Sequence, residues 1–254
     1  MTLILVLMLA LLSACGHPKQ AHVSVPPPPP PASTSETAAA EPSAKIPAAN
    51  ENPGKPEEEA DLAEPTIPSG TKPLATETGI ASWYGPPYHN RRGSNGEIYN
   101  MHAMTAAHRT FPLGSIVRVT NVKTGATALV RITDRGPFIP GRILDLSLAA
   151  ARKLDVWGPG TAEVRVQLMQ TPVPIDFGGK WAVQIGGFPD EHSATKLADH
   201  LARRYRNANV LRFKSPAGDW WIRVRVLDDA RERAYQVAKE TTTPEGAVFV
   251  VRLD

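Results

Sequence analysis

Four titratable side chains stand beside turns or short apolar stretches in the middle of the chain, where they can do acid–base chemistry. Glu97 follows an Asn-Gly turn pair, and Asp134 precedes Arg-Gly-Pro at the end of an alternating run. His108 and Asp145 lie in short, mostly apolar segments. A carboxyl group can act first as a general acid and then as a base, while a histidine can position it or shuttle a proton. A free aspartic acid titrates near 3.9, so an acid at neutral pH needs a desolvated or anionic neighbourhood.

Each of these residues also has a structural interpretation. An aspartate in a turn often accepts backbone N–H bonds, and on the residues alone this is the commoner role for Asp134. His108 is as readily a hydrogen-bonded core histidine, Glu97 a solvated turn acid, and Asp145 the ion-pair partner of a nearby arginine. The single cysteine excludes a disulfide scaffold, and the histidines lack the paired spacing of a metal site. No metal and no cofactor is predicted.

Short β-type runs separated by turn signals must position these groups. The sequence predicts strands over residues 79–84, 115–121, 126–133 and 163–168, and a short helix over 147–154 that begins at the N-cap Ser147. Strands this short and this regularly spaced favour a small β-barrel over residues 78–170.

A second folded region follows Pro172 and Pro174 and covers residues 176–254. Strands are expected over 181–187, 208–213, 220–227 and 247–253, with helices over 191–205 and 228–240. This duplicated βαβ order predicts a four-stranded antiparallel sheet with two helices on one face.

Strict alternation divides the side chains of this sheet between its two faces. It sends Val183 towards the helices and leaves Gln184, Trp221 and Arg223 on the open face, with Phe188 at the rim. An outward tryptophan favours a ligand-binding face over ordinary surface decoration. The same βαββαβ layout fits RNA-recognition modules, but the secretion signal described next argues against a nucleic-acid partner.

The N-terminal part of the chain differs sharply in composition. Fourteen of the 25 prolines lie between Pro18 and Pro73, and no aromatic residue precedes Trp83. Residues 15–77 are therefore predicted to be a disordered Pro/Glu-rich tether. Residues 16–77 carry a net charge of −5 and residues 78–254 a net charge of +8, so the folded part suits anionic polymers or membrane surfaces.

Residues 1–14 have the features of a secretory signal, with ten consecutive apolar residues from Leu3 to Leu12. Leu12-Ser13-Ala14-Cys15 then resembles a bacterial lipobox. The resemblance implies cleavage before Cys15 and lipidation of its thiol, which would anchor the chain in a membrane. The alternative is an ordinary signal peptide with a chance cysteine.

Three long motifs carry a family resemblance. GIASWYG, SNGEIYNMHAMTAAHRTFPLGSIVRVTN and VRITDRGPFIPGRILDLSLAAARKL resemble the rare lipoprotein A family, which are septal lytic transglycosylases with a six-stranded double-psi β-barrel. The resemblance implies that Asp134 is the acid/base, with His108 and then Glu97 as its catalytic partners. Flat aromatic rings stack on sugars, so Trp83, Tyr84 and Tyr88 are expected in the substrate groove.

WAVQIGGF and WIRVRV resemble the SPOR domain, which recognises septal peptidoglycan stripped of its stem peptides. One departure from the SPOR pattern is Leu227-Asp228-Asp229 in place of the usual Gly-Pro-Phe. The expected fold is thus mainly β plus α+β: a tether, a double-psi β-barrel and a βαββαβ SPOR-type sandwich. The glycan-binding residues are expected to be Gln184, Phe188, Trp221 and Arg223.

Together these resemblances imply an endolytic peptidoglycan lytic transglycosylase that leaves 1,6-anhydro-muramyl ends. Its expected partners are stem-stripped glycan strands, a membrane reached through the lipid anchor, and divisome proteins. The expected location is the outer membrane, facing the periplasm, with a cell-membrane anchor as the second choice. The alternative function is a non-catalytic, expansin-like peptidoglycan-binding lipoprotein.

Replacing the thiol tests the anchor. Cys15→Ser should move the protein from the membrane fraction to the soluble fraction, because a serine hydroxyl cannot form the thioether to a lipid. The measurement is an immunoblot of fractionated cells washed in high salt. Retention of Cys15→Ser in the membrane fraction would contradict the lipobox interpretation.

Overall fold

A computed structural model describes residues 63–215, 218–243 and 246–254. The expected signal, Cys15 and most of the expected tether lie outside the described residues.

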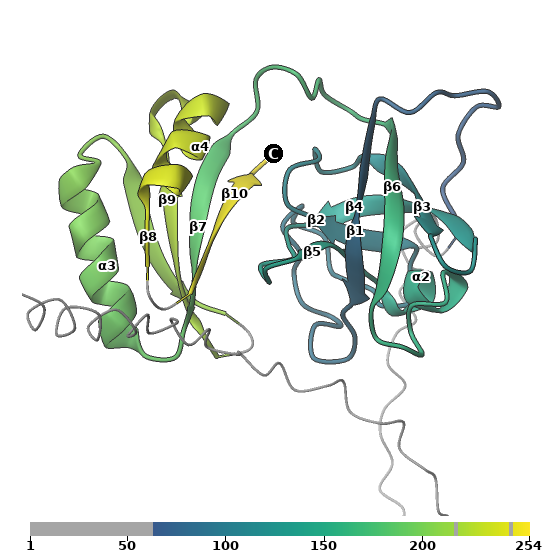
Figure 1. The fold of residues 1–254 in the computed structure, drawn as a ribbon, viewed down its shortest axis with the longest axis horizontal. Helices are drawn as coiled ribbons and strands as arrows, with labels where there is room; N and C mark the ends of the chain where they lie inside the picture. Colours follow the sequence, from purple (N-terminus) through teal and green to yellow (C-terminus); the bar gives the residue numbers. More distant parts are fainter. Residues whose placement is uncertain (1–62, 216–217, 244–245) are drawn as a thin grey trace, which may run out of the picture. The chain divides into compact units, whose positions relative to one another are not determined.

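The first domain is a closed barrel of six strands (Figure 1). They are β1 (Ala75–Trp83), β2 (Thr105–His108), β3 (Ile116–Asn121), β4 (Thr127–Asp134), β5 (Arg142–Leu146) and β6 (Ala162–Gln170). Around the barrel their order is β1-β5-β2-β4-β3-β6, with β1/β5 and β2/β4 parallel and the other pairs antiparallel. The six-stranded barrel is therefore confirmed, and its four alternating strands lie close to the predicted ranges.

Alternation fills the interior of this barrel. Along β3 and β4 every second residue is buried, so that apolar side chains meet inside. The core consists mainly of valine, leucine, isoleucine and alanine, including Val117, Val119, Val130, Ile132 and Leu144. Helix α2 (Leu148–Lys153) adds Ala150 and Ala151 to the core, and Ser147 caps it as predicted by accepting the N–H of Ala150.

The barrel begins earlier than expected. Strand β1 starts at Ala75, whereas the sequence placed residues 75–77 in the tether. Residues 75–78 pair with residues 165–168 of β6, and this pairing extends the sheet beyond the alternating run. The earlier start brings Glu77 into the folded barrel.

The second domain is a four-stranded antiparallel sheet with two helices (Figure 1). Its elements are β7 (Trp181–Phe188), α3 (Glu191–Arg204), β8 (Asn209–Lys214), β9 (Trp220–Arg225), α4 (Arg231–Glu240) and β10 (Ala247–Arg252). The strand order is β10-β7-β9-β8, as expected for βαββαβ. Helix α4 starts three residues later than predicted because a 3-10 turn, η1 (Leu227–Asp229), precedes it and Asp228 has a positive φ of 58°.

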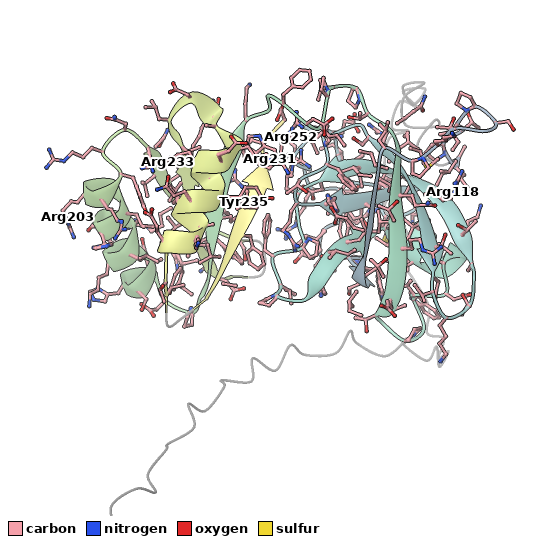
Figure 2. The ribbon with its side chains drawn as sticks, turned by 45° about the horizontal axis from the view of Figure 1, so that its top comes forward. Arg118, Arg203, Arg231, Arg233, Tyr235 and Arg252 are labelled. Carbon is pink, nitrogen blue, oxygen red and sulfur yellow. The ribbon has the colours of Figure 1, made fainter. Side chains whose placement is uncertain are left out.

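The inward residues of this sheet agree with the predicted alternation. Val183, Ile185, Ile222 and Val224 are fully buried in the core with residues of α3 and α4. At the start of β7, the ring centre of Trp181 lies 5.3 Å from the guanidinium carbon of Arg231 on α4. Arg231 is labelled in Figure 2. The helices therefore cover one face of the sheet, and the other face carries Gln184 and Arg223 together with the aromatic residues Phe213, Trp221 and Phe249.

Phe188 departs from that alternation. It was expected at the rim of the open face, but it is 2% exposed and belongs to the helix-side core. The register between β7 and β9 shifts between Gly186 and Phe188, and Gly187 has a φ of +86°. This bulge adds one residue to the strand and reverses the side to which Phe188 points.

Within the described part of the chain, no helix combines the length and the apolar character needed to cross a membrane.

Candidate active site

Asp134 ends β4 and is held by three hydrogen bonds to one carboxylate oxygen. Its Oδ1 accepts the backbone N–H of Ser94 at 3.0 Å, the hydroxyl of Ser94 at 2.5 Å, and the backbone N–H of Arg135 at 2.7 Å. All of these donors are neutral groups. Within the described part of the chain, these three hydrogen bonds converge on Oδ1 and none reaches Oδ2.

The loop that carries Ser94 is tied to the end of β4. The N–H of Asn95 donates to the carbonyl of Thr133, and the N–H of Gly93 donates to the carbonyl of Glu97. The side-chain oxygen of Asn95 accepts the N–H of Glu97. The Asn-Gly turn noted in the sequence therefore closes on itself and positions Ser94 beside Asp134.

Glu97 forms a two-point ion pair with Arg131 of β4. Its two oxygens lie 2.7 and 3.3 Å from the guanidinium nitrogens. The hydrogen bonds from Arg131 lower the pKa of Glu97, although its side chain is 52% exposed. The ion pair with Arg131 therefore favours the charged form of Glu97.

Ala107 of β2 lies between Asp134 and Asp145 in the barrel sheet. It is opposite Asp134 on the parallel neighbour β4 and opposite Asp145 on the antiparallel neighbour β5. Partners across neighbouring strands project to the same face of a sheet, so both carboxyl groups share a face. Burial raises the pKa of Asp145, and Arg142 at 2.7 Å opposes this shift. The predicted ion pair of Asp145 is thus with Arg142.

His108 follows Ala107 and is 2% exposed. Its Nδ1 accepts the backbone N–H groups of Thr110 and Phe111 at 3.2 and 3.0 Å, so the proton of the neutral ring is on Nε2. Nε2 faces Glu77 Oε2 at 3.3 Å. Burial lowers the pKa of His108, while the hydrogen bond from His108 lowers the pKa of Glu77. The pair is a neutral imidazole donating to a carboxylate.

Successive residues of a strand face opposite sides, so the ring of His108 points away from the face shared by Ala107 and Asp134. Within the described part of the chain no hydrogen bond or ion pair joins His108 to Asp134. The two are linked through Arg135 instead, whose Nη1 donates to the carbonyls of His108 and Phe111. His108 therefore orders the loop that holds Arg135 beside Asp134.

Three tyrosines gather beside the aspartates. The rings of Tyr84 and Tyr99 stack with centroids 4.3 Å apart, and Tyr88 meets Tyr84 edge-on at 5.9 Å. Burial raises the pKa of all three phenols, with smaller contributions from Asp134 or Asp145 in each case. Tyr88 is the most exposed of the three and fits the expected sugar groove. Trp83, which was also expected in the groove, instead packs against the barrel core.

A small cavity of about 20 Å³ opens beside Asp134. It is lined by loop 93–100 and by the ends of β2 and β4, including Asn95, Tyr99, Thr105 and Thr133. Sequence analysis did not single out Ser94, Asn95 or Thr105 as functional residues. The sequence Asn95-Gly96 indicates an Asx turn. Ser94 and Thr105 lie near Asp134 only because segments distant in sequence come together, so the residues around them give no sign of a functional role.

On the open face of the second domain, Arg223 donates from Nε and Nη2 to Gln184 Oε1 at 3.3 and 2.9 Å. The Arg223 guanidinium lies 5.2 Å from the ring centre of Phe213, and burial lowers the pKa of Arg223. Trp221 is only 8% exposed and lies across Gly186, where a Cβ would come within 2.3 Å of the indole. The structure therefore brings Gln184, Trp221 and Arg223 to one face.

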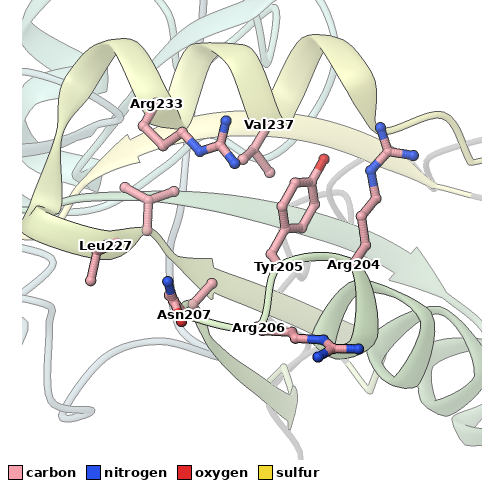
Figure 3. Close-up of a pocket in the computed structure, with 9 residues that line it drawn as sticks. Arg204, Tyr205, Arg206, Asn207, Leu227, Arg233 and Val237 are labelled. Atoms are coloured by element: carbon pink, nitrogen blue, oxygen red, sulfur yellow. The ribbon is translucent and has the colours of Figure 1, made fainter.

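A larger cavity of about 340 Å³ lies in the second domain between the end of α3, the start of β8 and α4 (Figure 3). Arg204, Arg206 and Arg233 line it, with Val237 among its apolar residues. None of the residues predicted from the sequence to bind or cleave substrate lies there. Among the described residues there is also no group of three or more metal-ligating side chains.

The buried histidine predicts a pH dependence of stability. The folded pKa of His108 lies below its unfolded value of about 6.5, so the unfolded chain binds more protons as the pH falls below 6.5. The contribution of His108 to the free energy of unfolding should therefore be fully present above pH 6.5 and be lost as the pH falls below 6.5 towards its lower folded pKa. Urea unfolding monitored by tryptophan fluorescence at pH 5, 6 and 7.5 measures this.

His108→Asn keeps an acceptor for the two N–H groups and should flatten the pH dependence. His102 is exposed, so His102→Asn should keep the wild-type dependence. An unchanged pH dependence in His108→Asn would show that His108 is not the group responsible.

Two family models match the chain, one to each domain. The model described as lytic transglycolase matches residues 76–166, which cover the barrel. The model described as SPOR domain matches residues 178–248, which cover most of the second domain.

Curated relatives match in sequence. Endolytic peptidoglycan transglycosylase RlpA of Helicobacter pylori J99 is 41% identical over 160 residues, covering 52% of this chain and 51% of the relative. The protein of that name from Campylobacter jejuni is 50% identical over 167 residues, covering 56% and 61%. That from Vibrio cholerae is 54% identical over 99 residues, covering 39% and 38%. The chain thus spans between about two fifths and three fifths of these relatives. With a double-psi β-barrel followed by a SPOR domain, it belongs to the rare lipoprotein A family.

Proposed function

We propose that this chain is an endolytic lytic transglycosylase that cleaves the β-1,4 bond between N-acetylmuramic acid and N-acetylglucosamine in peptidoglycan. The relatives that carry this activity in their names support the proposal. The observation that carries it is the state of the carboxyl groups in the barrel. Glu97 and Asp145 are each paired with an arginine, and Glu77 accepts a hydrogen bond from the buried His108, which points away from the face of Asp134. Among the described residues, the side-chain oxygen of Asp134 accepts its hydrogen bonds from Ser94 and from the N–H of Arg135, all neutral donors.

Asp134 is the proposed acid and base. As the C1–O4 bond breaks, protonated Asp134 gives its proton to the departing oxygen. The 6-hydroxyl of the same muramic acid attacks C1 and transfers its proton to the Asp134 carboxylate, which closes the 1,6-anhydro ring. The attack is intramolecular, so it gains a high effective molarity and needs no second carboxylate to activate water.

His108 and Glu77 act as positioning residues in this scheme. The His108–Glu77 pair fixes the loop that contacts Arg135, and the N–H of Arg135 in turn binds Asp134. Tyr84, Tyr88 and Tyr99 provide aromatic surface on which sugar rings can stack. Glu97 orients Arg131 and closes the loop that carries Ser94.

The SPOR domain supplies glycan binding in the same proposal, with Gln184, Trp221 and Arg223 forming the binding face and stem-stripped septal glycan as its ligand. The predicted signal and Cys15 support a lipid-anchored protein in the outer membrane, facing the periplasm. Divisome proteins are the proposed protein partners at the septum.

Asp134→Asn should abolish cleavage without unfolding the barrel. The amide keeps an oxygen that accepts the three hydrogen bonds on Oδ1, but it has no acidic proton for the leaving oxygen. General acid catalysis contributes about 10²–10⁴-fold, so the loss should be plain in a timed digest of stem-stripped sacculi analysed by mass spectrometry. Glu97→Gln is the matched control and should retain most of the activity.

The products discriminate between the candidate functions. Anhydro-muramyl ends indicate a transglycosylase, reducing ends a hydrolase, and intact glycan the expansin-like binding protein. Loss of activity in Glu97→Gln but not in Asp134→Asn would assign the acid to Glu97.

Arg223→Ala in the Asp134→Asn chain should weaken binding to stem-stripped glycan by about tenfold or more, because hydrogen bonds from a charged group are worth about 1.5–3 kcal/mol. Co-sedimentation with sacculi measures it. Arg203→Ala, on the exposed side of α3 (Figure 2), removes an equal charge and should bind like its parent. Equal binding to sacculi that retain their stem peptides would argue against the proposed ligand.

A further inference from the structure

The cavity of about 340 Å³ in the second domain takes no part in the proposed function (Figure 3). It lies where α3 ends and beside α4, and therefore on the side of the sheet that the helices cover. The proposed glycan-binding residues Gln184, Trp221 and Arg223 lie on the other face of that sheet. Ligand pockets in proteins begin at about 300 Å³, so this cavity is large enough for a ligand of its own.

The lining of this cavity is positively charged. Arg204, Arg206 and Arg233 are three of its nine residues, and none of the nine is an aspartate or a glutamate. Arg204 forms an ion pair with Glu240 at 3.2 Å. Within the described part of the chain, neither Arg206 nor Arg233 is paired with a carboxylate. The cavity therefore has an excess of positive charge that suits an anionic ligand.

A hydrogen-bond network holds two of these arginines in place. Arg233 Nη1 donates to Gln236 Oε1 at 2.7 Å, and Gln236 Nε2 donates to Glu240 Oε1 at 2.8 Å. The other oxygen of Glu240 accepts from Arg204 at 3.2 Å and from the Tyr205 hydroxyl at 3.0 Å. The guanidinium carbons of Arg204 and Arg233 lie 5.5 and 5.7 Å from the ring centre of Tyr205. Both side chains are thus ordered without a ligand, which lowers the entropic cost of binding one.

Apolar side chains complete the cavity. Val226 and Val237 are its buried apolar residues, whereas Leu227 is 51% exposed. Leu227 begins η1, the segment that departs from the SPOR pattern and has no role in the proposed function. An exposed leucine next to buried valines extends the apolar surface on which the hydrocarbon of a ligand can pack. We therefore expect the ligand to carry an apolar group beside its anionic one.

Asn207 indicates which kind of molecule carries both groups. It lines the cavity and, among the described residues, its side chain makes no hydrogen bond. An amide side chain has a donor and an acceptor, and a peptide group offers the matching acceptor and donor, whereas a phosphate dianion offers acceptors alone. Guanidinium groups also match the planar geometry of a carboxylate. These features favour an acidic peptide over a phosphorylated lipid or polymer.

We propose that this cavity is a docking site for an acidic segment of a partner protein, in which a glutamate or aspartate lies next to an apolar residue. Arg206 and Arg233 bind the carboxylate, Leu227 contacts the apolar side chain, and Asn207 bonds the peptide backbone. The site goes beyond the proposed function, since it needs neither cleavage nor glycan. Because it lies on the helix side of the sheet, the second domain can hold a partner and a glycan strand together.

Fluorescence anisotropy with three labelled hexapeptides tests the chemistry of the ligand. The full chain should bind a peptide made of glutamate and leucine, the Glu/Leu peptide, at least about tenfold more tightly than one with glutamine in place of glutamate. A neutral amide cannot replace a carboxylate beside two guanidinium groups. A peptide with serine in place of leucine should also bind more weakly. Equal binding of the glutamate and glutamine peptides would overturn the proposal.

Two substitutions locate the binding. Arg206→Glu should weaken binding of the Glu/Leu peptide by about tenfold, because it replaces attraction by like-charge repulsion. Leu227→Ser should weaken it by about threefold through lost apolar contact. Arg203→Glu is the matched control, since Arg203 is exposed on α3 and does not line the cavity (Figure 2). At about 0.15 M salt it should bind like wild type, and an equal loss in Arg203→Glu would overturn the site.

Anionic vesicles test the competing class of ligand. Vesicles of phosphatidylcholine and phosphatidylglycerol should not displace the Glu/Leu peptide from the full chain. If the chain binds these vesicles through Arg206 and does not bind the peptide, the cavity is a lipid site and the proposal is overturned.

Glycan binding separates this site from the proposed glycan face and also checks the fold. Arg206→Glu should bind stem-stripped sacculi like wild type, and saturating Glu/Leu peptide should not displace wild type from them. Competition between peptide and sacculi, or loss of both ligands in Arg206→Glu, would overturn the docking site. If wild type binds and cleaves no sacculi but its peptide binding still depends on Arg206, the proposed function fails and the docking site stands.

Discussion

The site depends on the position of β2 between β4 and β5. Ala107 pairs with Asp134 on one side and Asp145 on the other, so a single methyl-bearing residue sets the lateral spacing of two carboxyl groups. Strand β4 runs parallel to β2 and β5 runs antiparallel to it, and in this register the end of β4 and the middle of β5 lie level with Ala107.

Around that pairing, each carboxyl group acquires a different electrostatic environment. Asp145 is buried and bound by Arg142, Glu97 is partly exposed and held by Arg131, and Glu77 accepts from a neutral His108. An ion pair favours the charged form of a carboxyl group, so pairing with Arg131 makes Glu97 less suited than Asp134 to donate a proton. Like Glu77, Asp134 is positioned by hydrogen bonds from neutral donors, the N–H and hydroxyl of Ser94 and the N–H of Arg135.

Periodicity predicted the parts of this fold in which alternation is regular. The long strands of the barrel and the βαββαβ order of the second domain could be predicted from the sequence because one face of each element is apolar. Strand β2 has all four residues buried and therefore no alternation to detect. Phe188 was misplaced because the bulge at Gly187 reverses the side of the strand, and His108 lacked its partner because Glu77 had been assigned to the tether. Asp134 could be proposed from its turn, whereas Ser94 and Thr105 reach the site only through pairing between segments distant in sequence.

The division into two domains has a physical consequence for a polymeric substrate. Among the described residues, the cavity beside Asp134 is small and the aromatic rings next to it are few, so on the proposed function the barrel by itself would bind any one sugar weakly. On the proposed function, the SPOR domain binds the same glycan strand or a neighbouring one through a separate face. Linking two weak sites makes the second binding event intramolecular, so its effective concentration is set by the short connection between residues 170 and 181 and not by the bulk protein. Tight binding in the barrel is then unnecessary, and its contacts can be reserved for placing the scissile bond against Asp134.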